Sequence, residues 1–169
     1  LRHPFYVMTT EVTQGMFEGL MGYNNSEYEG EYHPVEHIDW HETASFANAL
    51  SLNQELEACY TCTGAGAEVS CTEAMDPYRC SGYRLPTVRE WELAARSGTS
   101  SSFWTGHGAV LGGDVAQEDW SDCLNPIVIN DGSSAVIADY AWYCGSNGQN
   151  GYEEGTKEVG QLLPNGFGL

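Results

Sequence analysis

Basic residues are scarce in this sequence. Its 169 residues include only 6 lysines and arginines against 24 aspartates and glutamates, so the formal net charge is −18 at pH 7. A chain with this charge repels the phosphate backbone of DNA and RNA, which proteins bind mainly through Lys and Arg. The same deficit disfavours binding to anionic membrane surfaces. We therefore expect no nucleic-acid partner and no electrostatic attachment to lipid.

Long hydrophobic runs and the common catalytic motifs are missing as well. No apolar stretch has the length of a membrane-spanning helix, and no nucleophile elbow, phosphate-binding loop or dinucleotide fingerprint occurs. No signal peptide is visible, and the sequence starts at Leu1 without an initiator methionine, so we expect a processed or partial chain. Disorder is not expected, because 41% of the residues are hydrophobic and 12% are aromatic.

The sequence has an even number of cysteines, and four of them cluster in a segment rich in Gly, Ser, Thr and Ala. The six are Cys59, Cys62, Cys71, Cys80, Cys123 and Cys144. Disulfides in an oxidising compartment and a four-thiolate zinc site in the cluster both fit this pattern. We favour disulfides at all six positions, because the cluster contains one Cys-x2-Cys pair and lacks a second. With the acidic composition, they indicate a periplasmic, cell-surface or secreted protein.

The N-terminal region predicts a strand followed by a helix. Residues 5–12 (FYVMTTEV) are rich in β-branched and aromatic types, which favour a strand. Thr13 can cap the helix that follows. Four apolar residues at three-and-four spacing would then share one face of that helix: Met16, Phe17, Leu20 and Met21.

Two further helices begin at capping-box signals, in which an N-cap side chain and a Glu three residues later bond to each other's backbone. The pairs are Asp39 with Glu42 and Thr87 with Glu90. The second helix should end near Asn53, and the third at Gly98. The predicted inner face of the third helix consists of Trp91, Ala94 and Ala95.

The remaining segments have little periodic pattern. We expect residues 57–82 to form a disulfide-rich insertion with little core of its own. Residues 99–169 should be irregular backbone packed on aromatic side chains and fixed by a Cys123–Cys144 link or a metal ion. No interdomain linker is evident, so residues 1–169 are expected to form a single domain.

Three sequence segments, taken in order, resemble a known family. They are residues 33–40 (HPVEHIDW) with the alanine-rich helix that follows, residues 82–98 (GYRLPTVREWELAARSG) and residues 159–169 (VGQLLPNGFGL). The series resembles the formylglycine-generating enzyme family, also called sulfatase-modifying factors, and its second segment is the most specific. The resemblance covers nearly the whole chain except the cysteine insertion at 59–80 and the loop at 107–135.

The resemblance implies both a fold and a metal ion. The fold is α+β, a C-type lectin-like architecture with short helices, a small antiparallel sheet and much irregular loop. The metal is a structural Ca²⁺, for which the positions that match the family's site are Asp139, Tyr140, Asn150 and Tyr152. Asn150 stands where the family usually has an acid, and one extra residue separates Tyr152 from Thr156. An Asx turn at Asn150 without an ion is the alternative.

The resemblance does not extend to catalytic residues. Family members that oxidise a substrate cysteine use two cysteines located after a segment that would follow Leu169, and none of the six cysteines here lies at those positions. We therefore predict no catalytic residue in this sequence. The interpretation is a non-catalytic extracytoplasmic module, a subunit or surface protein that displays loops to a protein or glycan partner. The alternative is the N-terminal portion of a formylglycine-generating oxidase.

Other clusters of charged residues have simpler explanations. Four of the six basic residues crowd one stretch, and ion pairing with nearby carboxylates is favoured over anion binding. They are Arg79, Arg84, Arg89 and Arg96. His37 and His41 are four residues apart, but a helix is expected to begin between them, so they need not face the same metal ion.

Overall fold

The computed structural model describes residues 4–99, 104, 137–142 and 155–169. The chain divides into two compact units, one of residues 1–90 with 156–159 and the other of residues 91–155 with 160–169. The expected single domain 1–169 stays a prediction. Among the described residues, no helix has both the length and the apolar character needed to cross a membrane.

Helix α1 (Gln14–Met21) begins and ends at local signals in the sequence. The hydroxyl of Thr13 accepts a hydrogen bond from the Met16 amide at 3.2 Å, as the capping prediction requires. Gly22 ends the helix in a left-handed conformation (φ 78°), which glycine adopts without strain. Of the four predicted core positions, Phe17 is fully buried, whereas Met16 is 40% exposed.

A buried glutamine in α1 organises the loop that follows the helix. The Gln14 amide donates to the carbonyls of Tyr28 (2.8 Å) and Pro34 (3.2 Å). Its oxygen accepts from the Asn24 side chain and the Gly30 amide, both at 3.0 Å. Every strong hydrogen-bonding group of this side chain is thus paired, so its burial at 1% exposure is not penalised.

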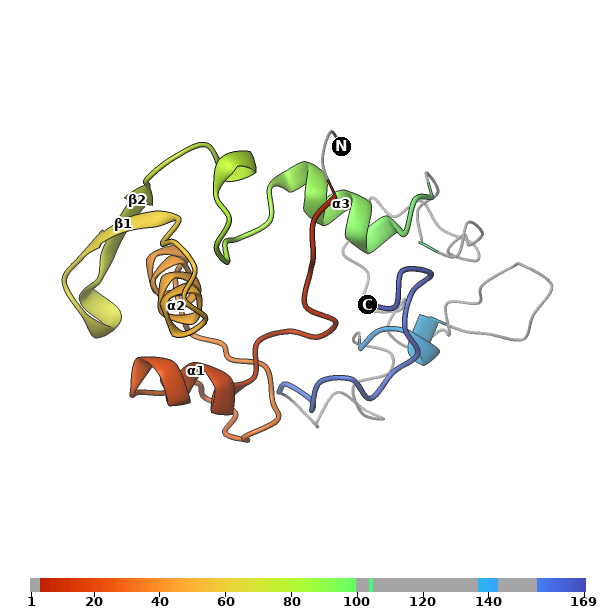
Figure 1. The fold of residues 1–169 in the computed structure, drawn as a ribbon. Helices are drawn as coiled ribbons and strands as arrows, with labels where there is room; N and C mark the ends of the chain where they lie inside the picture. The colour runs from red at the N-terminus through yellow and green to blue at the C-terminus, as the bar shows by residue number, and fades with distance from the viewer. Residues whose placement is uncertain (1–3, 100–103, 105–136, 143–154) are drawn as a thin grey trace, which may run out of the picture. The chain divides into compact units, whose positions relative to one another are not determined.

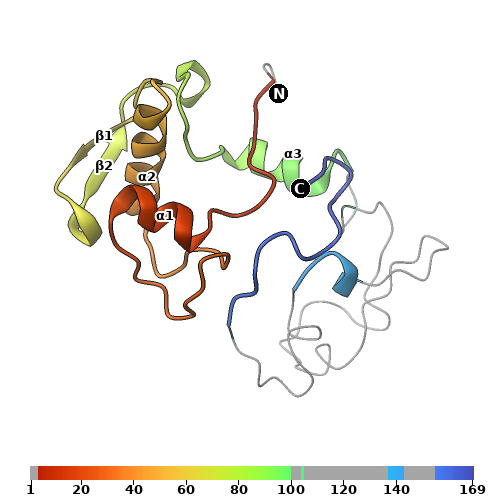
Figure 2. The same cartoon turned by 60° about the horizontal axis from the view of Figure 1, so that its bottom comes forward.

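Helix α2 (Trp40–Asn53) starts with the predicted capping box. The Asp39 carboxylate accepts from the Glu42 amide (2.8 Å), and the Glu42 carboxylate accepts from the Asp39 amide (2.9 Å). Figures 1 and 2 show α2 between α1 and a β-hairpin, and its small residues Ala44 and Ala47 are buried there. Alanine at these positions lets the hairpin approach the helix closely.

The hairpin consists of antiparallel strands β1 (Tyr60–Thr63) and β2 (Ser70–Glu73), joined across η1 (Gly66–Glu68). Two side chains of α2 hydrogen-bond to its backbone. The Asn48 amide pairs with both backbone groups of Tyr60 at 2.8 and 3.1 Å, and His41 Nδ1 accepts from the Cys71 amide at 3.0 Å. Helix and hairpin therefore share polar as well as apolar contacts.

The C-terminal part of α2 also fixes the chain that leads to the third helix. The buried Ser51 hydroxyl donates to the Ala47 carbonyl (2.8 Å) and accepts from the Tyr83 amide (2.7 Å). A Cβ at Gly82 would collide with the carbonyl oxygen of Glu57, so only glycine fits this crossing. After η2 (Pro77–Arg79), the chain continues into helix α3 (Val88–Arg96).

The second unit includes most of α3 and the C-terminal segment. Gly98 has φ 80° after the helix, in agreement with the predicted stop. The Asn165 side chain donates to the Ala94 carbonyl (2.8 Å), and the Leu163 amide donates to the carbonyl of Asp139 (2.9 Å) in η4 (Ile137–Asp139). These bonds tie residues 160–169 to the helix and to η4.

Two local expectations from the sequence are wrong. Residues 5–12 do not form a strand, because they have no partner strand in the described part of the chain, and Tyr6, Val7 and Met8 are exposed. On α3, Ala94 is buried as predicted, but Trp91 is 60% exposed and Ala95 is also exposed, and the other buried residue is Glu90. Helical periodicity did not reveal that the buried face carries a charge.

The cysteine segment contributes more to the core than we expected. Its residues Cys59, Tyr60, Val69 and Cys71 form one buried cluster with Ala44 and Ala47 of α2. The segment alternates buried and exposed side chains over short strands, which explains why it lacks a helical pattern. The apolar core of the first unit is therefore partly built from the segment outside the family resemblance.

We expect Asn48→Ala to lower the free energy of unfolding by about 2 kcal/mol, because it leaves both backbone groups of Tyr60 without their partner. Urea denaturation followed by circular dichroism measures this change. The matched control is Asn53→Ala at the exposed C-terminal residue of the same helix, which should leave stability nearly unchanged. Equal effects of the two substitutions would contradict the docking role of Asn48.

Candidate functional site

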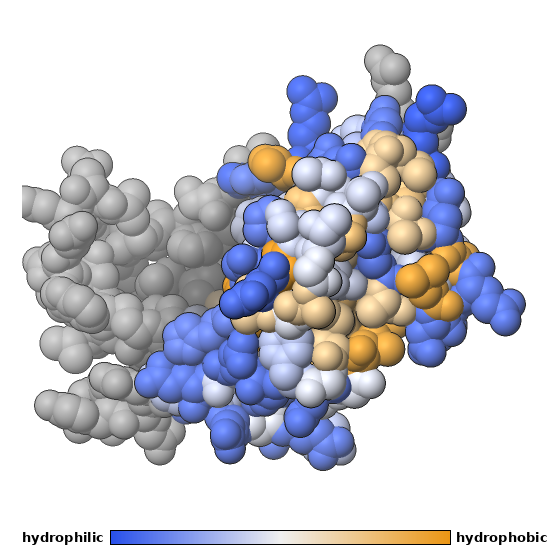
Figure 3. Space-filling model, turned by 90° about the vertical axis from the view of Figure 1, so that its left-hand side faces the viewer, coloured by the Kyte–Doolittle hydropathy of each residue, from blue (hydrophilic) through white to orange (hydrophobic). Residues whose placement is uncertain are grey.

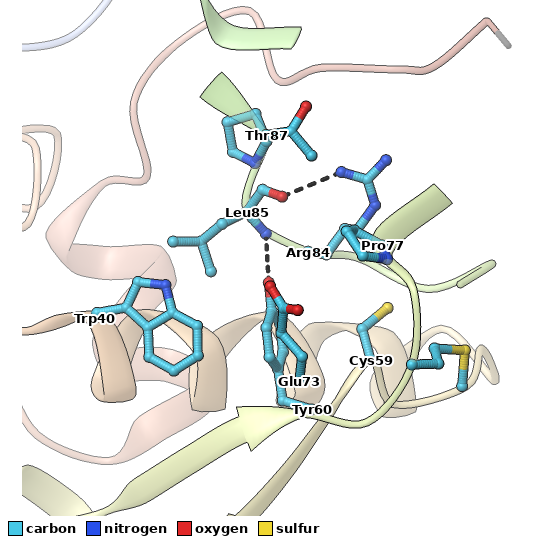
Figure 4. Close-up of a pocket in the computed structure, with 10 residues that line it drawn as sticks. Trp40, Cys59, Tyr60, Glu73, Pro77, Arg84, Leu85 and Thr87 are labelled. Atoms are coloured by element: carbon cyan, nitrogen blue, oxygen red, sulfur yellow. Dashed lines mark hydrogen bonds between the residues drawn. The ribbon is translucent and has the colours of Figure 1, made fainter. Parts of the chain in front are cut away.

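A pocket in the first unit is the candidate site. Its volume is about 250 Å³, and the residues that line it come from α2, the hairpin and the segments on either side of η2. They are Trp40, Cys59, Tyr60, Glu73, Met75, Pro77, Arg84, Leu85, Pro86 and Thr87. Figure 4 shows Trp40 and Leu85 on one side of Tyr60, with Arg84 and Pro77 on the other.

The register of the two strands places Tyr60 and Glu73 next to each other at the floor of the pocket. Tyr60 on β1 lies directly opposite Glu73 on β2, and cross-strand partners have adjacent side chains on one face of the sheet. The Tyr60 hydroxyl accepts from the Leu85 amide at 3.0 Å (Figure 4), which ties the lead-in to α3 to the hairpin. Burial raises the pKa of Tyr60, so the phenol stays protonated at neutral pH.

Trp40 forms an aromatic wall of the pocket. Its ring meets Tyr60 edge-to-face, with the centroids 5.5 Å apart and an interplanar angle of 89°. Trp40 is 42% exposed, so part of the residue remains available to solvent. Seen from the side of the hairpin, the described surface is largely hydrophilic or neutral, and strongly hydrophobic side chains occur in separate small groups (Figure 3).

An ion pair holds the opposite wall of the pocket. The two terminal nitrogens of Arg84 bond to the two carboxylate oxygens of Glu90, each at 2.8 Å. Glu90 also accepts from the Thr87 amide (2.8 Å) and hydroxyl (2.9 Å). The bonds from Arg84 are the main reason that the pKa of Glu90 falls from 4.5 to about 2.

Arg84 has a second contact that further restricts its orientation. Its guanidinium carbon lies 5.9 Å from the centroid of the Tyr78 ring, a cation–π arrangement. The Arg84 side chain is only 15% exposed. Because its charge is matched by Glu90, this arginine is a structural part of the pocket wall and is not a free anion-binding group.

The cysteine cluster is joined in two disulfides, Cys59–Cys80 and Cys62–Cys71. The second lies within the hairpin, where Cys62 and Cys71 are cross-strand partners. The described residues contain no free cysteine, so no four-thiolate zinc site forms in the cluster. Cys123 and Cys144 lie outside the described residues.

The predicted calcium positions are described in part. Asp139 is the last residue of η4 and is exposed, and Tyr140 follows it, with its ring 5.1 Å from that of Trp104. A carboxylate and a neighbouring carbonyl are oxygen ligands of the kind that Ca²⁺ prefers. Asn150 and Tyr152 lie outside the described residues. Within the residues described, no three His, Cys, Asp or Glu side chains gather as a metal-binding group.

The other sequence-predicted groups have structural partners. His41 bonds to the hairpin backbone, and His37 lies 3.0 Å from the Glu36 carboxylate.

Of the four clustered arginines, Arg84 pairs with Glu90, and Arg96 pairs with Glu92 at 2.6 Å. Ion pairing, the favoured interpretation, is thus observed for two of them.

Sequence reasoning missed the pocket itself. Trp40, Arg84 and Thr87 lie within the segments that carry the family resemblance, but Tyr60, Glu73 and Met75 lie in the insertion. The one available signal was the alternation of small polar residues with Tyr60, Cys62 and Cys71, which predicts a hairpin that cysteines can close. No sequence pattern indicated that the hairpin would lie beside the lead-in to α3.

Comparisons with known proteins agree with the resemblance. A family model described as "Sulfatase-modifying factor enzyme 1-like domain" matches residues 1–169. The chain is 31% identical over 173 residues to "Chaperone protein LppX" of Paenibacillus barcinonensis, with 98% of this chain and 57% of that protein aligned. It is 32% identical over 102 residues to "Formylglycine-generating enzyme" of Mycobacterium tuberculosis, with 60% of this chain and 28% of that protein aligned.

A solved structure shares the fold. "Treponema denticola variable protein 1" aligns with a TM-score of 0.60 and 26% identity, over 94% of this chain and 55% of that one. The predicted family and the α+β fold class are therefore confirmed. The chain spans little more than half the length of this structure, 57% of the Paenibacillus protein and 28% of the Mycobacterium protein.

We expect Glu90→Gln to lower the free energy of unfolding by about 3 kcal/mol at pH 7, because it leaves the poorly exposed Arg84 guanidinium without its counter-ion. The pKa of Glu90 is about 2 in the fold and 4.5 otherwise, so its contribution is complete above pH 4.5 and is lost as the pH falls toward 2. The stability difference between the native protein and this variant should shrink over that range. Urea titrations at several pH values measure it.

The matched control is Glu92→Gln on the same helix. It breaks the Glu92–Arg96 pair, whose side chains are 47% and 43% exposed, and should change stability by less than about 0.5 kcal/mol. A loss for Glu90→Gln as small as that for Glu92→Gln would show that the Arg84 pair does not hold the pocket wall.

Proposed function

The chain belongs to the family of sulfatase-modifying factor enzyme 1-like domains, and from this premise we propose that it is a non-catalytic binding or structural module that works outside the cytoplasm. The observation that carries the proposal is the use of its cysteines. Every cysteine in the described residues forms a disulfide that closes the hairpin or links it to the chain before α3. These sulfurs cross-link the hairpin, of which Cys59 lines the pocket, and they are not free for thiol chemistry.

The partner we propose is a protein, with a glycan as the alternative. A relative that covers nearly all of this chain bears the name of a chaperone, a class of protein that acts by contacting other proteins. The pocket offers an exposed aromatic wall and polar groups on a cross-linked frame, which are features of a recognition surface. The two disulfides support an oxidising, extracytoplasmic location.

The competing function is that of a formylglycine-generating oxidase of which this chain forms the N-terminal portion. The identity of 32% to a formylglycine-generating enzyme over 102 residues favours it. The resemblance places the two catalytic cysteines of such an oxidase beyond the segments matched here. The two functions therefore differ in whether the full-length protein converts a substrate cysteine.

The first experiment incubates the full-length protein with a cysteine-containing sulfatase-type peptide, Cu²⁺ and oxygen, and follows the peptide by mass spectrometry. The proposed non-catalytic role predicts that the cysteine remains unconverted. Conversion to formylglycine would contradict a non-catalytic role and support the oxidase.

The second experiment replaces Trp40, which is 42% exposed at the pocket, with photoreactive benzoylphenylalanine in the full-length protein in intact cells. We expect a discrete protein adduct on irradiation. The control places the same probe at Leu52, an exposed residue of α2 that does not line the pocket, and should give no such adduct. Adducts at neither position, or at both equally, would contradict binding through the pocket, and a glycan adduct would support the alternative partner.

We also propose that a structural Ca²⁺ is held by the oxygens of Asp139, Tyr140, Asn150 and Tyr152. Chelation should lower the melting temperature, because an ion that binds only the folded chain stabilises it by mass action. Asp139→Ala should abolish that response while the backbone bond between Asp139 and Leu163 remains. An unchanged melting temperature after verified removal of metal from the native protein would refute the site.

A further inference from the structure

We propose that the pocket receives a lysine or arginine side chain of the protein partner. This inference rests on the proposed binding function and specifies the chemistry that the pocket recognises. It is built on three groups that line the pocket, the Trp40 indole, the Tyr60 ring and the Glu73 carboxylate.

Glu73 supplies the negative charge. It is exposed at the C-terminal end of β2, and no ion pair involves it within the described part of the chain. Glu73 lies opposite Tyr60 across the strands, and its charge adds to the effect of burial, which is the main cause of the raised pKa of that phenol. A cationic group that enters the pocket therefore meets a carboxylate without an internal counter-ion.

Trp40 and Tyr60 supply the aromatic surface. The T-shaped contact with Tyr60 fixes the orientation of Trp40, which is 42% exposed, and an indole ring is a favourable contact for a cation. The Tyr60 hydroxyl already accepts from the Leu85 amide, so the ring cannot swing away without breaking that bond. The aromatic wall is thus pre-organised, which lowers the entropic cost of binding.

The positive charge that lines the pocket, Arg84, already has a partner. Arg84 is matched by the Glu90 carboxylate through two bonds of 2.8 Å and packs against Tyr78. Arg84 therefore has an internal counter-ion, whereas Glu73 is the charged residue of the lining without an ion-pair partner in the described part of the chain. The formal charge of −18 on the whole chain also attracts positively charged partners to this protein.

The size of the pocket favours one side chain over a larger ligand. Its volume of about 250 Å³ is below the range of about 300–1,000 Å³ typical of sites for drug-sized ligands and cofactors. The methionine and proline residues on its walls, Met75, Pro77 and Pro86, can contact the aliphatic stem of a Lys or Arg while the charged end reaches Glu73.

The test titrates the full-length protein with the blocked tripeptide acetyl-Gly-Arg-Gly-amide and, separately, with its neutral match acetyl-Gly-Gln-Gly-amide. NMR shifts of the Trp40 indole and the Leu85 amide report on the pocket. We expect saturable shifts with the arginine peptide, at least about fivefold weaker binding of the glutamine peptide, and weaker arginine binding as the salt concentration rises.

Two substitutions that each remove one negative charge distinguish binding in the pocket from electrostatic attraction to the acidic chain as a whole. Glu73→Gln should weaken arginine binding about fivefold or more. Glu68→Gln, in the turn of the same hairpin and outside the pocket, should change it less than about twofold. Unchanged melting temperatures establish that both variants are folded.

Several outcomes would overturn the proposal. They are equal binding of the two peptides, equal effects of the two substitutions, and binding of simple sugars in place of the arginine peptide. If the probe at Trp40 also cross-links to a protein, any of these results would refute only the recognition of a Lys or Arg side chain. The proposed binding function would still be supported. Conversion of a substrate cysteine by the full-length protein would instead refute the proposed function itself.

Discussion

The docking of the hairpin onto α2 is the contact on which the first unit depends. A two-stranded sheet has little stability alone, and this one gains it from two sources. Asn48 and His41 of α2 bond to the strand backbone, and the disulfides close the hairpin and fasten its base. The apolar cluster beneath it can form because Ala44 and Ala47 leave room for the strands. Without this docking, one wall of the pocket would be missing.

Glu90 connects helix capping to the architecture of the pocket. A capping box needs only a carboxylate that reaches back to the N-cap, and Glu90 does this for Thr87. The same carboxylate also binds Arg84 through both oxygens, so the start of α3 and the segment before it form one rigid corner. Tyr60 then joins that corner to the hairpin through the Leu85 amide. A local sequence signal thus takes part in a long-range contact.

Sequence reasoning succeeded where short-range rules govern the structure. Caps at Thr13 and Asp39 and the glycine after α3 follow from hydrogen bonding over a few residues, so the helices were predictable. It failed where partners distant in sequence decide the outcome. Burial of Glu90 depends on Arg84, and residues 5–12 have strand-like composition without a strand beside them. The pocket could not be predicted from the sequence for the same reason, because its walls come from three separate segments.

The way in which α2 holds the hairpin has an evolutionary consequence. Asn48 recognises the peptide groups of residue 60, and His41 recognises that of residue 71, so neither contact depends on the identity of the outward-facing side chains of the strands. Those positions can therefore change without loss of the scaffold, provided that the buried residues are kept. Substitutions at the exposed strand positions should therefore alter what the hairpin presents to a ligand without disturbing its docking on α2.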